Sequence, residues 1–135
     1  QASQDLISMK IGGSTCEYGN PVDYWPPKKF IGTEICTIYY LGSEILLNDD
    51  DVDGLILSLE FLQEIEFDFY IFSKIKEKFP NKPIITLLIQ AEQEGAKRVV
   101  DIATELRIPV FENEVERAVR GYAMLLKYYR EIKKG

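Results

Sequence analysis

Four acidic residues and a glycine near the middle of the chain have the spacing of a calcium-binding loop. Asp49, Asp51, Asp53, Gly54 and Glu60 fit the pattern D-x-D-x-D-G-x5-E of an EF-hand. Carboxylate oxygens in this arrangement bind a hard cation, so one interpretation is a calcium sensor. The same residues also fit a turn between a helix and a buried strand, where Asp tolerates turn geometry and Gly relieves strain.

The ninth position of this loop favours the turn. An EF-hand supplies an oxygen ligand or a bridging water there and starts its second helix before the last glutamate. The chain instead has Leu57, inside the strand-like apolar segment Leu55–Leu59, and it has no second acidic loop to form a pair. We therefore expect a solvated turn, and we keep an EF-hand-like calcium site at 49–60 as the less favoured alternative.

The sequence contains no histidine, which removes much of enzyme chemistry at once. Ser-His-Asp triads, imidazole general bases, phosphohistidine intermediates and most transition-metal sites all need that side chain. We expect no catalytic residue and no metal ligand set in this chain.

The composition of the chain indicates which binding partners and which cellular compartment to expect. A net charge of −6 argues against nucleic acid or an anionic membrane, because both require clustered basic residues. Cys16 and Cys36 are too few and too unpatterned for a disulfide framework or a zinc site, which indicates a reducing cytoplasm. The chain begins with Gln rather than Met, so we expect either a piece of a longer polypeptide or a separate subunit.

Apolar patterning predicts one domain over 1–135 in which strands and helices alternate. The expected strands are Leu6–Ile11, Leu55–Leu59, Ile84–Ile89 and Pro109–Phe111. Helical stripes are expected over 31–45, 65–79, 94–106 and 115–129, the last capped by Asn113 with Glu116 three residues later. A long loop, 12–29, follows the first strand. This alternation predicts a three-layer αβα fold with a flavodoxin-like parallel sheet of four to five strands.

A flavodoxin-like strand order of 2-1-3-4 would bring the loops after the first and third strands together at a ligand-binding crevice. The residues expected to line that crevice are Gly12, Gly13, Ser14, Thr15, Asn20, Asp23, Gln90, Ala91 and Glu92. Asn20 and Asp23 equally fit a role in shaping the loop, and a Gly-Gly pair is by itself a weak phosphate motif.

Five short motifs, in order along the chain, resemble those of the NDP-forming acyl-CoA synthetases, the superfamily of acetate–CoA ligase and succinyl-CoA synthetase. They are Asp5–Gly13, Asn20–Asp23 (NPVD), Tyr39–Gly54 (YY…ILLNDDDVDG), Lys82–Ile84 (KPI) and Arg107–Arg120 (RIPVF…ERAVR). The resemblance implies the flavodoxin-like ligase domain of those enzymes. It also implies that the nucleotide-grasp domain, the CoA-binding domain and the phosphorylated histidine lie elsewhere, together with the sites for CoA and for ATP or ADP.

The chain departs from succinyl-CoA synthetases where their Gly-Gly pair opens a helix facing the phosphate. Phe61 and Leu62 stand at the matching positions, bracketed by Glu60, Glu64 and Glu66, so we expect the phosphate contact to be lost. The resemblance thus implies an assembly role in an oligomeric ligase, inactive as an isolated chain. The alternative is a stand-alone α/β protein that binds a small ligand or a partner, for example through the second apolar face of the helix expected over 65–79.

Overall fold

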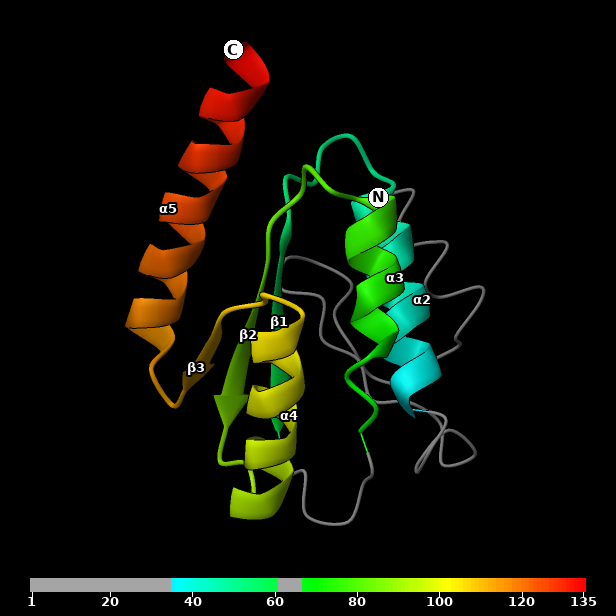
Figure 1. The fold of residues 1–135 in the computed structure, drawn as a ribbon, viewed down its shortest axis with the longest axis vertical. Helices are drawn as coiled ribbons and strands as arrows, with labels where there is room; N and C mark the ends of the chain where they lie inside the picture. The colour runs from blue at the N-terminus through cyan, green and yellow to red at the C-terminus, as the bar shows by residue number, and fades with distance from the viewer. Residues whose placement is uncertain (1–34, 61–66) are drawn as a thin grey trace.

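A computed structural model describes residues 35–60 and 67–135 (Figure 1). These residues form four helices and three strands, α2 (Ile35–Leu47), β1 (Leu55–Glu60), α3 (Ile71–Lys78), β2 (Ile84–Ile89), α4 (Gln93–Glu105), β3 (Val110–Glu112) and α5 (Val115–Lys134). The expected strand Leu6–Ile11 and the loop 12–29 lie outside the described residues.

The three strands form one parallel sheet in the order β1-β2-β3. Leu57 is opposite Thr86, and Thr86 is in turn opposite Val110. Because β1 and β2 are direct neighbours, the expected order, with the first strand between them, is wrong. Apolar runs mark where strands lie, whereas the choice of neighbour depends on how each helical crossover packs, and the local pattern does not encode that choice.

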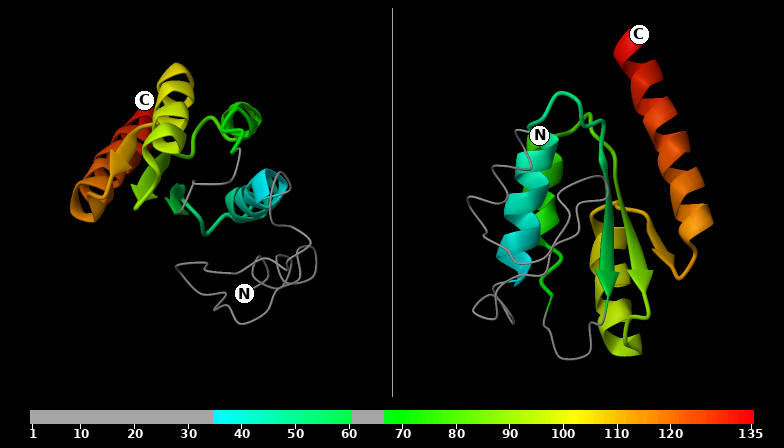
Figure 2. Two further views of the ribbon diagram at one scale, coloured as in Figure 1. Left: turned by 90° about the horizontal axis from the view of Figure 1, so that it is seen from below. Right: turned by 180° about the vertical axis from the view of Figure 1, so that it is seen from behind.

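Helices cover both faces of this sheet, as Figures 1 and 2 show. Ile84 and Leu88 of β2 pack in a core with α2, α3 and α4, whereas Ile85 and Leu87 point the other way, toward α5. The alternation of side chains along a strand explains this division, and it is why β2 is apolar at nearly every position. The α/β class and the layered arrangement are therefore confirmed for the described residues, with three strands.

The segment before α3 differs from the expected helix over 65–79. Phe67 and Phe69 are buried while Asp68 and Tyr70 are exposed, and the backbone at 67–70 is coil and turn rather than helix. The Asp68 side chain accepts the backbone N–H of Tyr70 at 3.0 Å and so favours a turn over a helix. Phe69 then packs on Phe72 with 4.9 Å between ring centroids, and both rings are fully buried. Phe67, Phe69 and Phe72 therefore belong to the core, whereas Tyr70 is 46% exposed.

Candidate functional site

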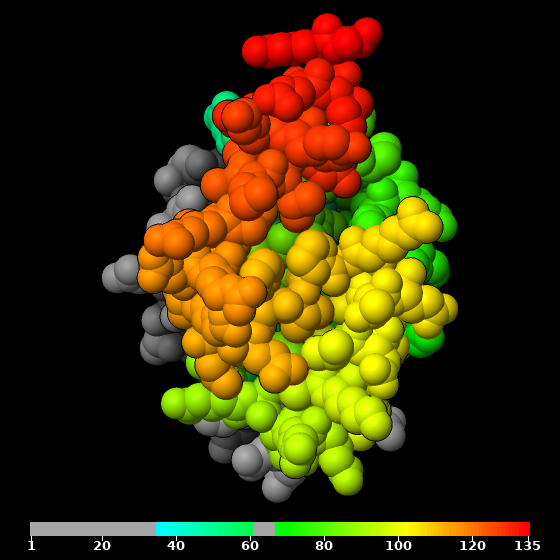
Figure 3. Space-filling view, turned by 60° about the vertical axis from the view of Figure 1, so that its left-hand side comes forward, coloured from blue at the N-terminus to red at the C-terminus, as the bar shows by residue number. Residues whose placement is uncertain are grey.

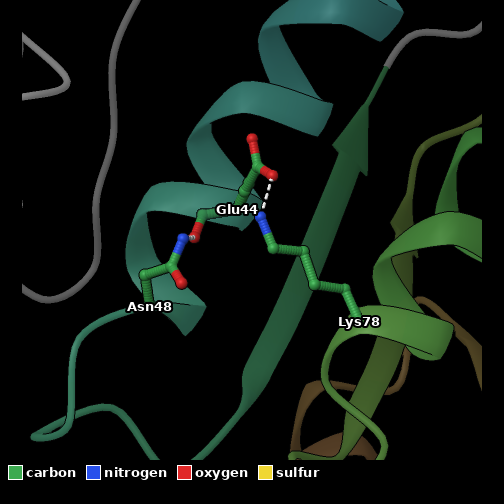
Figure 4. A network of polar contacts seen from close by, with 3 residues as sticks. All are labelled: Glu44, Asn48 and Lys78. Carbon is green, nitrogen blue, oxygen red and sulfur yellow. Dashed lines mark hydrogen bonds and ion pairs between the residues drawn. The ribbon is translucent and has the colours of Figure 1, made fainter.

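Polar contacts stabilise the turn between α2 and β1, both at the end of α2 and within the turn itself. Figure 4 shows Lys78 of α3 in an ion pair with Glu44 of α2, while the side-chain amide of Asn48 donates to the Glu44 carbonyl at 3.0 Å. Within the turn, the Asp51 N–H donates to the Asp49 carboxylate at 3.0 Å. The acidic residues therefore shape a turn that ends α2.

Lys82 forms hydrogen bonds with backbone carbonyl oxygens at the end of α2. Its ammonium group donates to the backbone oxygens of Leu47 at 2.8 Å and Asp49 at 2.7 Å. A cation at a helix C-terminus is stabilised by the helix dipole and satisfies carbonyls that have no helical partner. The protein thus supplies its own cation at the point where the acidic sequence suggested a metal.

The geometry of the described residues also argues against the calcium alternative at 49–60. Residues Leu55–Glu60 form an extended strand, so Glu60 lies roughly 20 Å from the turn, at about 3.3 Å per residue. Asp53 instead binds Arg130 of α5 at 2.9 Å. Among residues 35–60 and 67–135, no group of three His, Cys, Asp or Glu side chains is placed to hold a metal ion.

Gly54 and Pro83 join the acidic turn to the start of β2. The Leu55 N–H donates to the Pro83 carbonyl at 2.9 Å, and a Cβ on Gly54 would lie 2.4 Å from that same oxygen. Only glycine allows this approach of the two backbones. Two motifs of the resemblance, the NDDDVDG turn and the KPI segment, are therefore in direct contact.

The carboxyl edge of the sheet contains three of the residues predicted to line the crevice, Gln90, Ala91 and Glu92. Gln90 has a φ of 50°, and its N–H donates to the Asn113 side-chain oxygen at 2.9 Å. Asn113 has a φ of 54° and donates its own N–H to the Leu88 carbonyl at 2.8 Å. Two adjacent strand ends are linked in this way, and the Gln90 side chain remains exposed.

This use of Asn113 corrects the expected capping box of the last helix. The residue before α5 is Glu114, which makes no side-chain cap, and the Asn113 side-chain oxygen accepts from the Gln90 N–H instead. The remaining predicted site residues lie outside the described residues, so the structure does not place them. These are Gly12, Gly13, Ser14, Thr15, Asn20 and Asp23.

Glu92 caps α4 and determines what this edge can bind. Its carboxylate accepts the N–H groups of Glu94 and Gly95, each at 3.0 Å, and these bonds lower the pKa of Glu92, the one from Glu94 most. A phosphate would need the same N–H groups. The carboxylates of Glu60 and Glu112 end the neighbouring strands, so the described part of this edge disfavours anions.

Sequence reasoning missed the contacts that join α3 to the end of α4. The Lys76 ammonium donates to the carbonyls of Leu106 at 2.7 Å and Arg107 at 3.2 Å, and its burial, then the Arg107 charge, lowers its pKa. The Tyr70 hydroxyl donates to Glu105 at 2.7 Å, which raises the pKa of Tyr70. A basic residue in the last turn of α3 was a visible signal, but its partners are distant in sequence.

Comparisons with known proteins leave the family open, since no family model, no curated protein and no solved structure matches this chain. Among the described helices, none combines the length and the apolar character needed to cross a bilayer.

Proposed function

We propose that this chain is the ligase-type module of an NDP-forming acyl-CoA synthetase, where it contributes to subunit assembly and to the wall of the active-site pocket. The proposal includes the finer fold, a three-layer αβα domain with a parallel sheet of four to five strands in which β1 and β2 are neighbours. Its partners are the nucleotide-grasp and CoA-binding domains or subunits, which carry the phosphorylated histidine.

The contact between Gly54 and Pro83 is the observation that supports this proposal most. Two motifs that resemble those of the superfamily, 28 residues or more apart in sequence, meet through one carbonyl oxygen and through the Lys82 ammonium. Residues that depend on one another in this way are expected to occur together in related folds. Their joint presence is therefore a stronger argument than either motif taken alone.

The described residues do not fit a phosphate, CoA or nucleotide. Glu92 fills the N-terminus of α4, and further carboxylates stand at the adjoining strand ends. A polyanionic ligand at this edge would meet repulsion rather than donors. We therefore assign CoA and ATP or ADP to the other domains, and we assign to this chain a role in shaping and joining them.

Purification of the tagged full chain from its source cell tests the proposal. We expect it to be recovered with a nucleotide-grasp chain and a histidine-bearing CoA-binding chain, or inside one longer polypeptide that contains both, as identified by mass spectrometry. Recovery of the chain alone, or only with copies of itself, would instead favour a stand-alone small-ligand-binding protein, in which Gly12, Gly13, Asn20 and Asp23 would have to be tested as ligand residues.

A further inference from the structure

Helix α5 exposes a ridge of large apolar side chains that the described protein does not cover. Met124, Tyr128 and Ile132 have 75%, 59% and 55% of their surface exposed. They are four residues apart, so they line one side of the helix. Figure 3 shows α5 crossing one face of the molecule, with its last turns standing clear of the rest. We call these three residues the α5 ridge.

The ridge is separate from the face by which α5 holds the sheet. Ala118, Tyr122 and Leu125 face Ile85 and Leu87 of β2 and form the core on that side. Gly121 allows the close approach of Phe111, whose ring would be 2.7 Å from a Cβ at that position. The helix is therefore anchored without the ridge, and no element within 35–60 and 67–135 covers the apolar side chains of the ridge.

Basic residues border the ridge at a regular interval. Arg120, Lys127 and Lys134 are seven residues apart, so they form one line beside the ridge, as flanking charges do in paired helices. Arg120 binds Glu116 at 2.5 Å and Lys127 lies 4.0 Å from Glu131, but all four side chains are largely exposed. Exposed pairs of this kind are weak and exchange readily for a partner's carboxylates.

The charge of α5 is opposite to that of the remainder of the chain. Six basic and two acidic residues give the helix a net charge of +4, so the rest of the protein, from a total of −6, carries −10. A shallow hollow of about 430 Å³ on α5 includes Lys127 and Lys134 but none of the three ridge residues; it is lined by Ala123, Leu126, Lys127, Arg130, Glu131 and Lys134. Its floor is apolar and its rim is mainly basic.

We propose that the α5 ridge binds an acidic amphipathic helix of another polypeptide chain or domain. Apolar side chains of the partner would pack on Met124, Tyr128 and Ile132, and its carboxylates would meet Arg120, Lys127 and Lys134. Pairing of α5 with α5 of a second copy is disfavoured, because it would oppose two helices of charge +4. An anionic bilayer is disfavoured by the chain's overall charge of −6. This inference concerns a surface and does not depend on the ligase assignment.

Site-specific photo-crosslinking in the source cell tests the proposal on the intact chain. The photoreactive amino acid p-benzoylphenylalanine replaces Tyr128 on the ridge, or, as the matched control, exposed Lys97 on α4. We expect an adduct from position 128 to one acidic peptide with apolar residues at helical spacing, and no such adduct from position 97. Sequencing of the adduct by mass spectrometry identifies the peptide.

Removing two basic side chains beside the ridge then tests whether the crosslinked contact depends on charge, as the proposed docking does and an adventitious contact does not. With the crosslinker at 128, the variant Arg120→Gln, Lys127→Gln should lower adduct yield about fivefold, whereas Lys97→Gln should not. Circular dichroism checks that the helix is retained. An adduct only to a second copy, only to lipid, to a basic or non-helical peptide, or with a yield unchanged by the double substitution overturns the proposal. Equal yields at 128 and 97 overturn it as well.

Discussion

The carbonyl oxygen of Pro83 lies directly against Gly54, where a Cβ would stand 2.4 Å from it. That oxygen also accepts the Leu55 N–H, so it fixes where β1 begins relative to β2. Replacement of Gly54 by alanine forces two backbones apart. We predict that Gly54→Ala lowers the free energy of unfolding by about 2 kcal/mol, the usual scale for overpacking.

Urea unfolding measures this loss, with Gly135→Ala as the control. A Cβ at Gly135 meets its nearest atom at 3.8 Å, an ordinary contact, so the control should match the parent protein. Parent-like stability of Gly54→Ala would show that the two backbones do not approach as closely as described.

Lys82 is expected to stabilise the fold through its two backbone acceptors. Lys82→Met keeps the aliphatic stem and removes one donor each from the carbonyls of Leu47 and Asp49, of which Asp49 keeps the Val52 N–H, at a cost of about 1–3 kcal/mol. Chemical unfolding should show this loss, while Lys97→Met, at an exposed position on α4, should change little. Equal effects of the two substitutions would contradict a stabilising role for the Lys82 hydrogen bonds.

Calcium should not stabilise this protein. A sensor-type EF-hand with micromolar affinity would gain roughly 4 kcal/mol from about 1 mM Ca²⁺. Residues 55–60 form a strand, and the Lys82 ammonium binds the backbone oxygen of Asp49 in the turn. We therefore expect the same unfolding temperature in Ca²⁺ and in chelator. A rise with Ca²⁺ that Asp49→Asn abolishes would restore the metal interpretation.

The cap of α4 should make stability depend on pH in the acid range. Hydrogen bonds from Glu94 and Gly95 lower the pKa of Glu92 in the folded state, so its contribution is present above the unfolded pKa and is lost as pH falls through the folded pKa. The stability gap between the parent and Glu92→Gln should therefore be larger at neutral pH than in strong acid.

Unfolding curves at the two pH values give this gap directly. Glu94→Gln is the control, since it removes a carboxylate from the same turn without removing the cap. A stability difference between the parent protein and Glu92→Gln that stays constant with pH would contradict a capping role for the Glu92 carboxylate.

The buried aromatic cluster should dominate stability on the α3 side of the sheet. Phe72 is fully buried against Phe69, so Phe72→Ala should cost about 3–5 kcal/mol. Tyr128→Ala, at an exposed position on the ridge, should stay within about 0.5 kcal/mol of the parent. Thermal unfolding of the two variants distinguishes a core residue from a surface one, and similar losses would contradict this division.

The sequence predicted the described elements well where local patterns determine them. Apolar runs at 55–59, 84–89 and 109–111 correspond to β1, β2 and β3 to within about a residue. The predicted helix over 65–79 begins too early, since α3 starts at Ile71. Ile65 and Phe69 have helical spacing in the sequence, but Phe67 and Phe69 are both buried before the helix begins.

Long-range relationships were beyond the sequence pattern. Nothing local indicates that Asn113 binds Gln90 instead of capping α5, or that Lys82 reaches the end of α2. The direct pairing of β1 with β2 is of the same kind, since it depends on crossover packing. Of the predicted crevice, Gln90, Ala91 and Glu92 are described, and the cap that Glu92 forms on α4 was not predicted.

Reconstitution of acyl-CoA synthesis tests the central claim most directly. The nucleotide-grasp and CoA-binding chains that co-purify with this protein are assayed with acid, CoA and ATP, with and without the 135-residue chain, or, for a longer polypeptide, with and without residues 1–135. We predict acyl-CoA formation only when the module is present, and none from the module alone. Full activity without it, or turnover by the isolated chain, would contradict the account.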